Sequence, residues 1–309
     1  MSAPAAPAAA PAPAAPAARP LAAAAWMLGA VALFSAMAVA GREASVELDT
    51  FEIMTWRSLV GLAIVVAALA ATGRLHLIRA RRLGLHLARN LFHFTGQNLW
   101  FFAVAAIPLA QVFAYEFTSP IWVAVLAPLL LGERFTRARG AAVTLGFAGI
   151  LLVARPWTEA GSAAFGIGQT AALGAAVMFA LNVMLTKRLS RSESTPSIMF
   201  WMTGLQALMG LATAGADLDV AIPSAAAAPW VLLIGVCGLA AHYCLTTALT
   251  LAPATVVSPM EFLRLPTIAV VGMLLYAEPL EPFVLIGAAV VFAGNLINLR
   301  AETRRRRAA

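Results

Sequence analysis

Two glutamates, Glu116 and Glu261, lie inside long apolar stretches of the chain. An ionisable side chain at the centre of a bilayer costs about 3 kcal/mol on insertion scales, so each one needs a functional or structural reason. A carboxylate there can bind a cationic solute or carry a coupled proton. Arg264 follows Glu261 by three positions on the same helix face, so a static ion pair is the structural alternative. Ser119 occupies the corresponding place after Glu116, which leaves Glu116 as the first candidate for proton coupling.

A polar stripe runs through residues 85–106. Arg89, His93, Gln97 and Trp100 recur at helical spacing, which places them on one face. Such a face cannot point to lipid. We therefore expect His93, Gln97 and Trp100 to line an interior cavity, while Arg89 extends toward the membrane surface. A hydrogen-bonded structural residue is the alternative reading of a buried histidine such as His93.

Two more side chains complete the candidate site from the first half of the chain. Tyr115, together with Trp100, offers a surface on which an aromatic or cationic solute can stack. Arg57 is a further charge within an apolar stretch, and the sequence allows it three partners: Glu116, an anionic solute, or Glu52.

The composition requires a membrane as solvent. The 309 residues are 61% hydrophobic and 11% charged, whereas soluble domains are roughly half apolar and about a quarter charged. Cys237 and Cys244 would lie about 10 Å apart along a helix, too far for a disulfide. No zinc-ligand spacing occurs, so we expect no metal and no cofactor. The net charge of +7 sits in short loops, a pattern of membrane orientation that argues against nucleic acid as a partner.

Ten stretches approach the length of about 20 apolar residues that a spanning helix needs. We therefore predict an all-α integral membrane protein with about ten transmembrane helices, preceded by a disordered Ala/Pro tail at residues 1–20. The first stretch ends in Ala-Val-Ala-Gly, which also resembles a signal-peptide cleavage site. The stretches are Leu21–Ala40, Phe51–Thr72, Leu85–Ala106, Ala110–Leu131, Gly140–Ala154, Gly166–Leu185, Ser197–Ala214, Trp230–Leu249, Thr255–Tyr276 and Phe283–Leu299.

The loops between these stretches differ in charge. Basic residues gather after the second, fourth, sixth and tenth helices, in 74–82, 134–139, 187–191 and 300–307, whereas the loops on the other side are mainly acidic. By the positive-inside rule, this asymmetry places both termini in the cytoplasm.

The chain matches itself when it is shifted by 145 residues. Within 108–155, the matched pairs are Pro108 and Pro253, Glu116 and Glu261, Phe117 and Phe262, Glu133 and Glu278, Phe147-Ala148-Gly149 and Phe292-Ala293-Gly294, and Arg155 and Arg300. We therefore divide the chain into repeats at 21–156 and 157–300, followed by a basic cytoplasmic tail at 301–309. Each repeat holds five helices, an odd number, so the second is inverted relative to the first. Inverted repeats suit alternating access, with rocking of the two halves around a binding site near the midplane.

The same offset extends the candidate site into the second repeat. His242 corresponds to Gln97, and Tyr243 corresponds to Asn98. We therefore expect His242 and Tyr243 on the wall of the central cavity.

The stretches FTSPIWVAVLAPLLLGER, GFAGILLVARP and EFLRLPTIAVVGMLLYAEPL carry a family resemblance. They resemble the drug/metabolite transporter superfamily, and more narrowly its EamA-type members, over about residues 21–300. The resemblance implies two inverted five-helix halves and a central cavity lined by helices three, four, eight and nine. The region of helices three and four looks like members that carry S-adenosylmethionine and riboflavin.

These observations favour a secondary transporter in a bacterial cytoplasmic membrane. Its partners would be the lipid bilayer and a small organic solute, such as an amino acid or a metabolite similar to S-adenosylmethionine or riboflavin. No phosphate-binding loop that could hydrolyse ATP occurs. The alternatives are an intramembrane enzyme acting on lipid or polyprenyl substrates, a channel, and a non-transporting sensor. The direction of transport, the coupling ion and the oligomeric state are left open.

Overall fold

The computed structural model describes residues 19–131, 136–155, 166–216, 220–252, 257 and 260–308. The Ala/Pro segment before residue 19 and two members of the repeat, Glu133 and Pro253, lie outside these residues.

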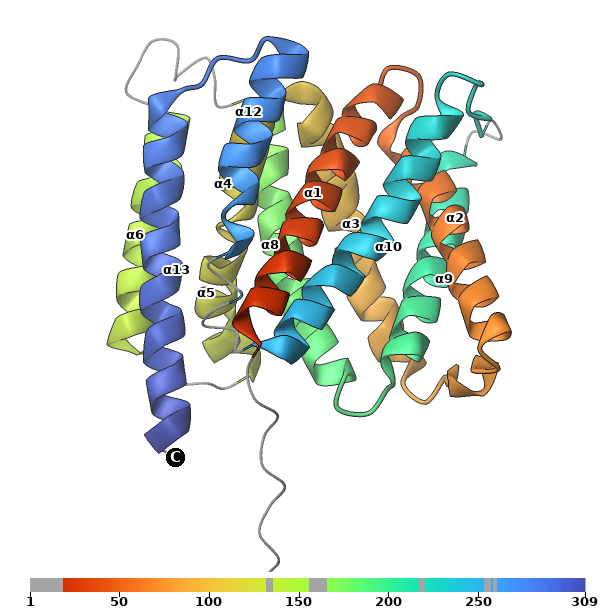
Figure 1. Cartoon of the computed structure of the whole chain (residues 1–309), viewed down its shortest axis with the longest axis horizontal. Coiled ribbons are helices and arrows are strands. Elements are labelled where there is room, and N and C mark those ends of the chain that lie inside the picture. The colour runs from red at the N-terminus through yellow and green to blue at the C-terminus, as the bar shows by residue number, and fades with distance from the viewer. Residues whose placement is uncertain are drawn as a thin grey trace, which may run out of the picture.

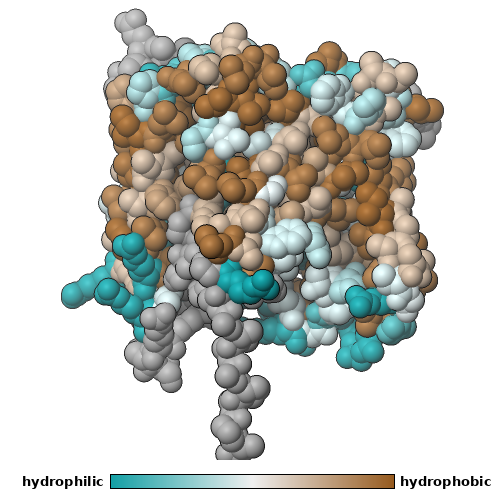
Figure 2. Space-filling model, in the orientation of Figure 1, coloured by the Kyte–Doolittle hydropathy of each residue, from teal (hydrophilic) through white to brown (hydrophobic). Residues whose placement is uncertain are grey.

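The described elements are all helices (Figure 1), and they form ten membrane spans, as predicted. Both α1 and α13 have their terminal ends on one face, which we call the terminal face, and the other side is the opposite face. Figure 2 shows apolar side chains over most of the visible surface, with hydrophilic ones gathered toward the terminal face. The helices are α1 (Pro20–Ala44), α2 (Thr50–Ala71), α3 (Leu83–Ala106), α4 (Leu109–Glu116), α5 (Ser119–Leu131), α6 (Arg137–Ala154), α8 (Ile167–Leu189), α9 (Thr195–Ala214), α10 (Ala228–Leu251), α12 (Arg264–Tyr276) and α13 (Pro282–Ala308), with a short 3-10 turn η1 at Leu75–Leu77.

Eight of the described spans are long and apolar enough to cross a bilayer by composition alone. The two remaining crossings are α3 and the ninth. The polar stripe lowers the hydropathy of α3, and the ninth crossing is interrupted, so that α12 has only 13 residues. The polar stripe and the interrupted crossing therefore both belong to helices that surround the interior of the molecule.

The fourth and ninth crossings are broken, which corrects the expectation of continuous helices. Helix α4 ends at Glu116, a turn occupies residues 117–118, and α5 begins at Ser119. The Thr118 hydroxyl donates to the Tyr115 carbonyl at 2.6 Å, and Asn295 of α13 donates to the Phe117 carbonyl at 3.0 Å. These side chains satisfy backbone groups that the break would otherwise leave unpaired inside the membrane.

The ninth crossing is broken at the place equivalent to the break in the fourth. Glu261 is helical, residues 262–263 form a turn, and α12 begins at Arg264. Glu116 is therefore the last residue of α4, and Glu261 directly precedes the equivalent turn. Discontinuous helices of this kind occur at the binding sites of transporters built from inverted repeats.

The repeat is visible in the helix boundaries of the two halves. Helices α2, α3, α5 and α6 begin 145 residues before α9, α10, α12 and α13, respectively. The inversion is visible in two equivalent tryptophans. The Trp56 indole donates to the Ala221 carbonyl at 2.9 Å on the opposite face, whereas the Trp201 indole donates to the Arg79 carbonyl at 2.8 Å on the terminal face.

The main helix contacts join one repeat to the other. Helix α1 packs along α10, α3 along α8, α2 along α9, and α6 along α13. The last pair is so close that a β-carbon on Gly149 would lie 2.6 Å from the Gly287 carbonyl oxygen, as expected where small residues let two backbones meet. The sequence halves therefore interlock, and the expectation that they rock as two separate bodies needs revision.

Helix α2 begins with a capping box, in which the Asp49 carboxylate accepts from the Phe51 and Glu52 amides and Glu52 accepts from the Asp49 amide. We expect Asp49→Ala to lower the free energy of unfolding by about 1 kcal/mol, because it leaves helix N-terminal donors unpaired. Ser194 caps α9 at the equivalent position, so Ser194→Ala should have a similar effect. Denaturant unfolding of the purified protein in detergent measures both changes, and a change below about 0.2 kcal/mol in both variants would contradict the capping role.

Candidate functional site

On the opposite face, Arg42 at the end of α1 ties three elements together. Its guanidinium forms an ion pair with Glu278, in the loop between α12 and α13, and donates to the Val104 and Ile107 carbonyls at the end of α3. Glu278 in turn accepts from the Leu109 amide at 2.9 Å. Arg42 therefore closes the opposite face over the ends of α1, α3, α4 and α12.

Further polar contacts reinforce this closure. Arg155 pairs with Glu281, and the Tyr276 hydroxyl donates to Glu43 at 2.8 Å. Ser224 donates to the Glu47 carboxylate from its hydroxyl and its amide, and these hydrogen bonds hold the pKa of Glu47 below its usual range.

Beneath this closure lies a cavity of about 260 Å³ at the centre of the molecule. It is lined largely by pairs of residues that are equivalent in the two repeats, so it lies on the axis that relates them. Among the lining residues, these pairs are Phe34 and Phe179, Met37 and Asn182, Gln97 and His242, Trp100 and Leu245, Glu116 and Glu261, Phe117 and Phe262, and Ser119 and Arg264.

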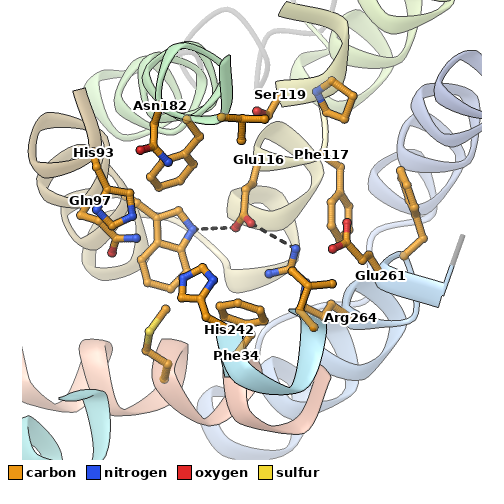
Figure 3. Close-up of a pocket in the computed structure, with 17 residues that line it drawn as sticks. Phe34, His93, Gln97, Glu116, Phe117, Ser119, Asn182, His242, Glu261 and Arg264 are labelled. Atoms are coloured by element: carbon orange, nitrogen blue, oxygen red, sulfur yellow. Dashed lines mark hydrogen bonds and ion pairs between the residues drawn. The ribbon is translucent and has the colours of Figure 1, made fainter. Parts of the chain in front are cut away.

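Glu116 is the centre of the polar contacts (Figure 3). One carboxylate oxygen accepts from the Trp100 indole at 2.8 Å, and the other lies 3.2 Å from a guanidinium nitrogen of Arg264. The Arg264 guanidinium lies 4.7 Å from the Phe34 ring centroid and 5.1 Å from that of Phe117. An aromatic cage therefore holds an ion pair that joins the first repeat to the second.

This pairing differs from the sequence-based alternative of a Glu261–Arg264 pair. The spacing of three residues places two side chains on one face only if the helix is continuous, and the turn at 262–263 breaks it. Among the described residues, Glu261 has neither a hydrogen bond nor an ion pair. The cavity therefore contains one carboxylate that is already paired and one that is not.

His93 and Gln97 line the cavity, as the stripe on α3 predicted. They are only 3% and 7% exposed. The Gln97 carbonyl oxygen accepts from Arg57 at 2.8 Å, a partner that was not foreseen for either side chain. Arg57 makes no ion pair with Glu116, Glu52 or any other described carboxylate.

Gln206 of α9 contacts His93 at 2.6 Å and Asn90 at 3.2 Å. Arg89 also belongs to this network, because it donates to Asn90 at 3.0 Å and to Thr186 at 3.0 Å. Arg89 is buried, so the expectation that it extends to the membrane surface is wrong. Its partners are supplied by the chain rather than by solvent.

Two predicted wall residues do not line the cavity. Tyr115 is 1% exposed and buried in the apolar core, and Tyr243 is 66% exposed on the outer surface against Trp26. Each follows or precedes a lining residue by one position, and adjacent residues on a helix point about 100° apart. His242, the neighbour of Tyr243, does line the cavity.

Sequence reasoning missed the phenylalanines that line the cavity, and it missed Gln206. Phe34 and Phe179 lie 145 residues apart, so extending the repeat into α1 and α8 would have shown them. Gln206 gave no such signal, because its role depends on contacts with α3 more than 110 residues away in the chain. Among the described residues, no three His, Cys, Asp or Glu side chains are grouped as metal ligands.

Comparison with known proteins agrees with this architecture. A riboflavin transporter of Rhizobium johnstonii is 33% identical over 72% of this chain and 72% of its own length. A riboflavin transporter of Vibrio cholerae is 26% identical over 93% of this chain and 96% of its own length. An S-adenosylmethionine uptake transporter of Rickettsia felis is 22% identical over 90% and 92% of the two chains.

A solved crystal structure shares the fold, with a TM-score of 0.63 and 18% sequence identity over 91% of this chain and 98% of the other. The sequence pattern of the EamA-like transporter family matches twice, over residues 21–155 and 166–300. These two matches coincide with the two inverted sets of helices. This multi-pass membrane protein, with its cavity between two broken helices, therefore belongs to the EamA-like transporter family.

Proposed function

We propose that this transporter carries a flat aromatic metabolite of the riboflavin type across the bacterial cytoplasmic membrane. The observation that carries the proposal is the lining of the cavity, where rings from both repeats, including Phe34, Trp100, Phe117 and Phe179, surround a small number of polar groups. Aromatic rings offer a planar solute stacking surfaces. The similarity to riboflavin transporters supports the same class of cargo.

A cationic solute related to S-adenosylmethionine is the second candidate. Glu261 favours it, because this carboxylate faces the cavity without a described partner. A cation could pair with Glu261 or displace Arg264 from Glu116. The similarity to S-adenosylmethionine transporters is lower in identity but covers as much of the chain.

The orientation follows from the loops. The terminal face carries many exposed arginines, including Arg74, Arg81 and Arg82. On the opposite face, Arg42 and Arg155 are both paired with carboxylates. The positive-inside rule supports placing the terminal face, with both termini, in the cytoplasm.

Alternating access would move composite bundles rather than the sequence halves. Helices α3, α4 and α5 pack on α8, and α10 and α12 pack on α1, so each bundle takes members from both repeats. We propose that these bundles tilt about the cavity, and that the repeats at 21–156 and 157–300 exchange conformations as they do so. Arg42 would hold the external side closed in the state seen here. Proton coupling through Glu116 requires that the proton compete with the ion pair to Arg264. Glu261 has no ion pair among the described residues, so it is the better candidate.

Uptake into proteoliposomes tests the function directly. We expect saturable uptake of labelled riboflavin, with stimulation by the same unlabelled solute on the other side. S-adenosylmethionine and amino acids serve as competing cargos, each measured with and without a pH gradient. Flux without saturation or counterflow would indicate a channel, binding without flux would indicate a sensor, and covalent change of the solute would indicate an enzyme; each of these outcomes contradicts the proposal.

A further inference from the structure

The polar side chains that α3 turns toward the cavity have their hydrogen-bonding roles fixed by arginines. An arginine side chain can only donate, so whatever atom it contacts must accept. Arg57 contacts a residue of the cavity wall directly. Arg89 is connected to another wall residue by a chain of hydrogen bonds.

The first contact sets the orientation of Gln97. Arg57 Nη1 lies 2.8 Å from Gln97 Oε1, so this atom must be the amide oxygen. The amide nitrogen of Gln97 has no hydrogen-bond partner among the described residues. Gln97 therefore has two N–H donors available to a solute in the cavity.

Arg89 is connected to His93 through the side-chain amides of Asn90 and Gln206. Arg89 Nη1 donates to Asn90 Oδ1 at 3.0 Å, while Asn90 Nδ2 donates to the His86 carbonyl at 2.8 Å. Because Asn90 Oδ1 is an acceptor, the Gln206 atom 3.2 Å from it must be the amide nitrogen.

The same Gln206 nitrogen lies 2.6 Å from His93 Nδ1. Gln206 Nε2 can only donate, so His93 Nδ1 accepts and carries no proton. A histidine with a bare Nδ1 is neutral and has its proton on Nε2. His93 is therefore also a donor at its remaining nitrogen.

We propose that His93 and Gln97 form a donor wall, which recognises a solute edge that carries conjugated carbonyl oxygens or ring nitrogens. The edge of a flavin that carries the C4 carbonyl oxygen and the ring nitrogen N5 is of this kind. Glu116 and Glu261 carry the acceptors, and Figure 3 shows Glu261 at the far side of the cavity from His93 and Gln97. Arg57 and Gln206 are positioning residues, because they act through Gln97 and His93. The proposal rests on the proposed function and adds which edge of the cargo meets which wall.

The wall also provides selectivity. A solute edge with an amino group or a positive charge would offer no acceptor to His93 and Gln97. Each buried donor left without a partner would cost about 1–3 kcal/mol of binding free energy. A bound flavin is expected to point its carbonyl edge at α3, while the hydroxyls of its ribityl chain donate to the carboxylates.

The test is the affinity of the purified full-length protein for riboflavin. Binding is measured by the quenching of flavin fluorescence. Gln97→Glu keeps the shape of the side chain but replaces its donors with oxygen acceptors, and we expect binding to weaken by about 10-fold to 100-fold. Gln169→Glu is the matched control. Gln169 lies in the first turn of α8 and accepts from the Gly166 amide at 3.0 Å, an interaction that a carboxylate retains.

A second ligand separates recognition from general damage to the cavity. The wild type should bind riboflavin more tightly than 4-thioriboflavin, because sulfur is a poor acceptor. Gln97→Glu should reduce this preference as well as the affinity. Unchanged affinity in Gln97→Glu, or an unchanged preference for oxygen over sulfur, would overturn the donor wall.

Nitrogen NMR of histidine-labelled protein tests the hydrogen-bond directions without any cargo. We expect the His93 signal, assigned by its loss in His93→Gln, to show a protonated Nε2 and a bare Nδ1. Gln206→Glu should reverse the two nitrogens, because a carboxylate accepts from Nδ1. A wild type protonated at Nδ1 would overturn the donor wall, whereas a wild type that shows the expected tautomer but binds no riboflavin would overturn the proposed cargo alone.

Discussion

Arg264→Gln is expected to lower the initial rate of uptake by about 100-fold or more. The substitution leaves Glu116 as an unpaired charge within the membrane, and removing one partner of a buried pair costs about 3–5 kcal/mol. Both side chains are mostly buried, with 11% and 16% of their surfaces exposed. The aromatic cage around the guanidinium would also lose its occupant.

The double variant Arg264→Gln with Glu116→Gln distinguishes the pair from its separate members. Removing both charges leaves no unpaired charge within the membrane. The double variant should therefore fold, and it should recover part of the initial rate of uptake. Arg74→Gln on the exposed terminal face controls for loss of an arginine and should stay within about two-fold of the wild type. If the well-folded single variant transports at the wild-type rate, the ion pair has no role in the transport cycle.

Arg42→Gln is expected to open the opposite face. The substitution removes an ion pair and the donors to the Val104 and Ile107 carbonyls, which together close the ends of the helices over the cavity. Hydrogen bonds that involve charged groups contribute about 1.5–3 kcal/mol each, so the closed conformation should lose at least tenfold in population.

Thiol labelling measures this opening. The reporter is Met37→Cys, which faces the cavity, in a background where Cys237 and Cys244 are replaced by alanine. A membrane-impermeant reagent added from the opposite face should label the reporter about tenfold faster in Arg42→Gln than in the parent.

Lys187 is the repeat equivalent of Arg42 and lies exposed at the end of α8, near the terminal face. Lys187→Gln is therefore the matched control, and it should not increase labelling from the opposite face. Equal labelling rates in Arg42→Gln, Glu278→Gln and their parent would contradict a closing role for this network.

The number and inversion of the helices could be predicted from sequence, because both follow from apolar length and from a repeat of fixed offset. The breaks in the fourth and ninth helices could not, since apolar residues such as Phe117 and Phe262 continue through them. Besides the equivalence of Glu116 and Glu261, the signals were Pro120 and Pro266 in the first turns of α5 and α12, and prolines are also tolerated within continuous membrane helices. Local spacing then predicted the wrong partner for Arg264, because that rule assumes an unbroken helix.

The stripe on α3 correctly placed His93, Gln97 and Trp100 in the cavity, since helical spacing is sufficient to define a face. It could not show that Arg57 and Gln206 fix the hydrogen-bonding roles of two of them. These partners come from other helices, and their positions depend on how α3 packs against α2, α8 and α9. Helical periodicity predicts which residues point inward, but not which side chains they meet.

The interlocking of the two repeats has a consequence for biogenesis. The ribosome delivers α1 to α6 before α8 to α13, yet the main contacts of the first set are with the second. During this interval Glu116 has already been inserted, while Arg264 has not been synthesised. The half-made protein therefore holds a costly polar group in the bilayer without its final partner, and it becomes a stable unit only when the second half arrives. We expect the first half to be degraded when it is expressed alone, and to accumulate when the second half is supplied as a separate chain.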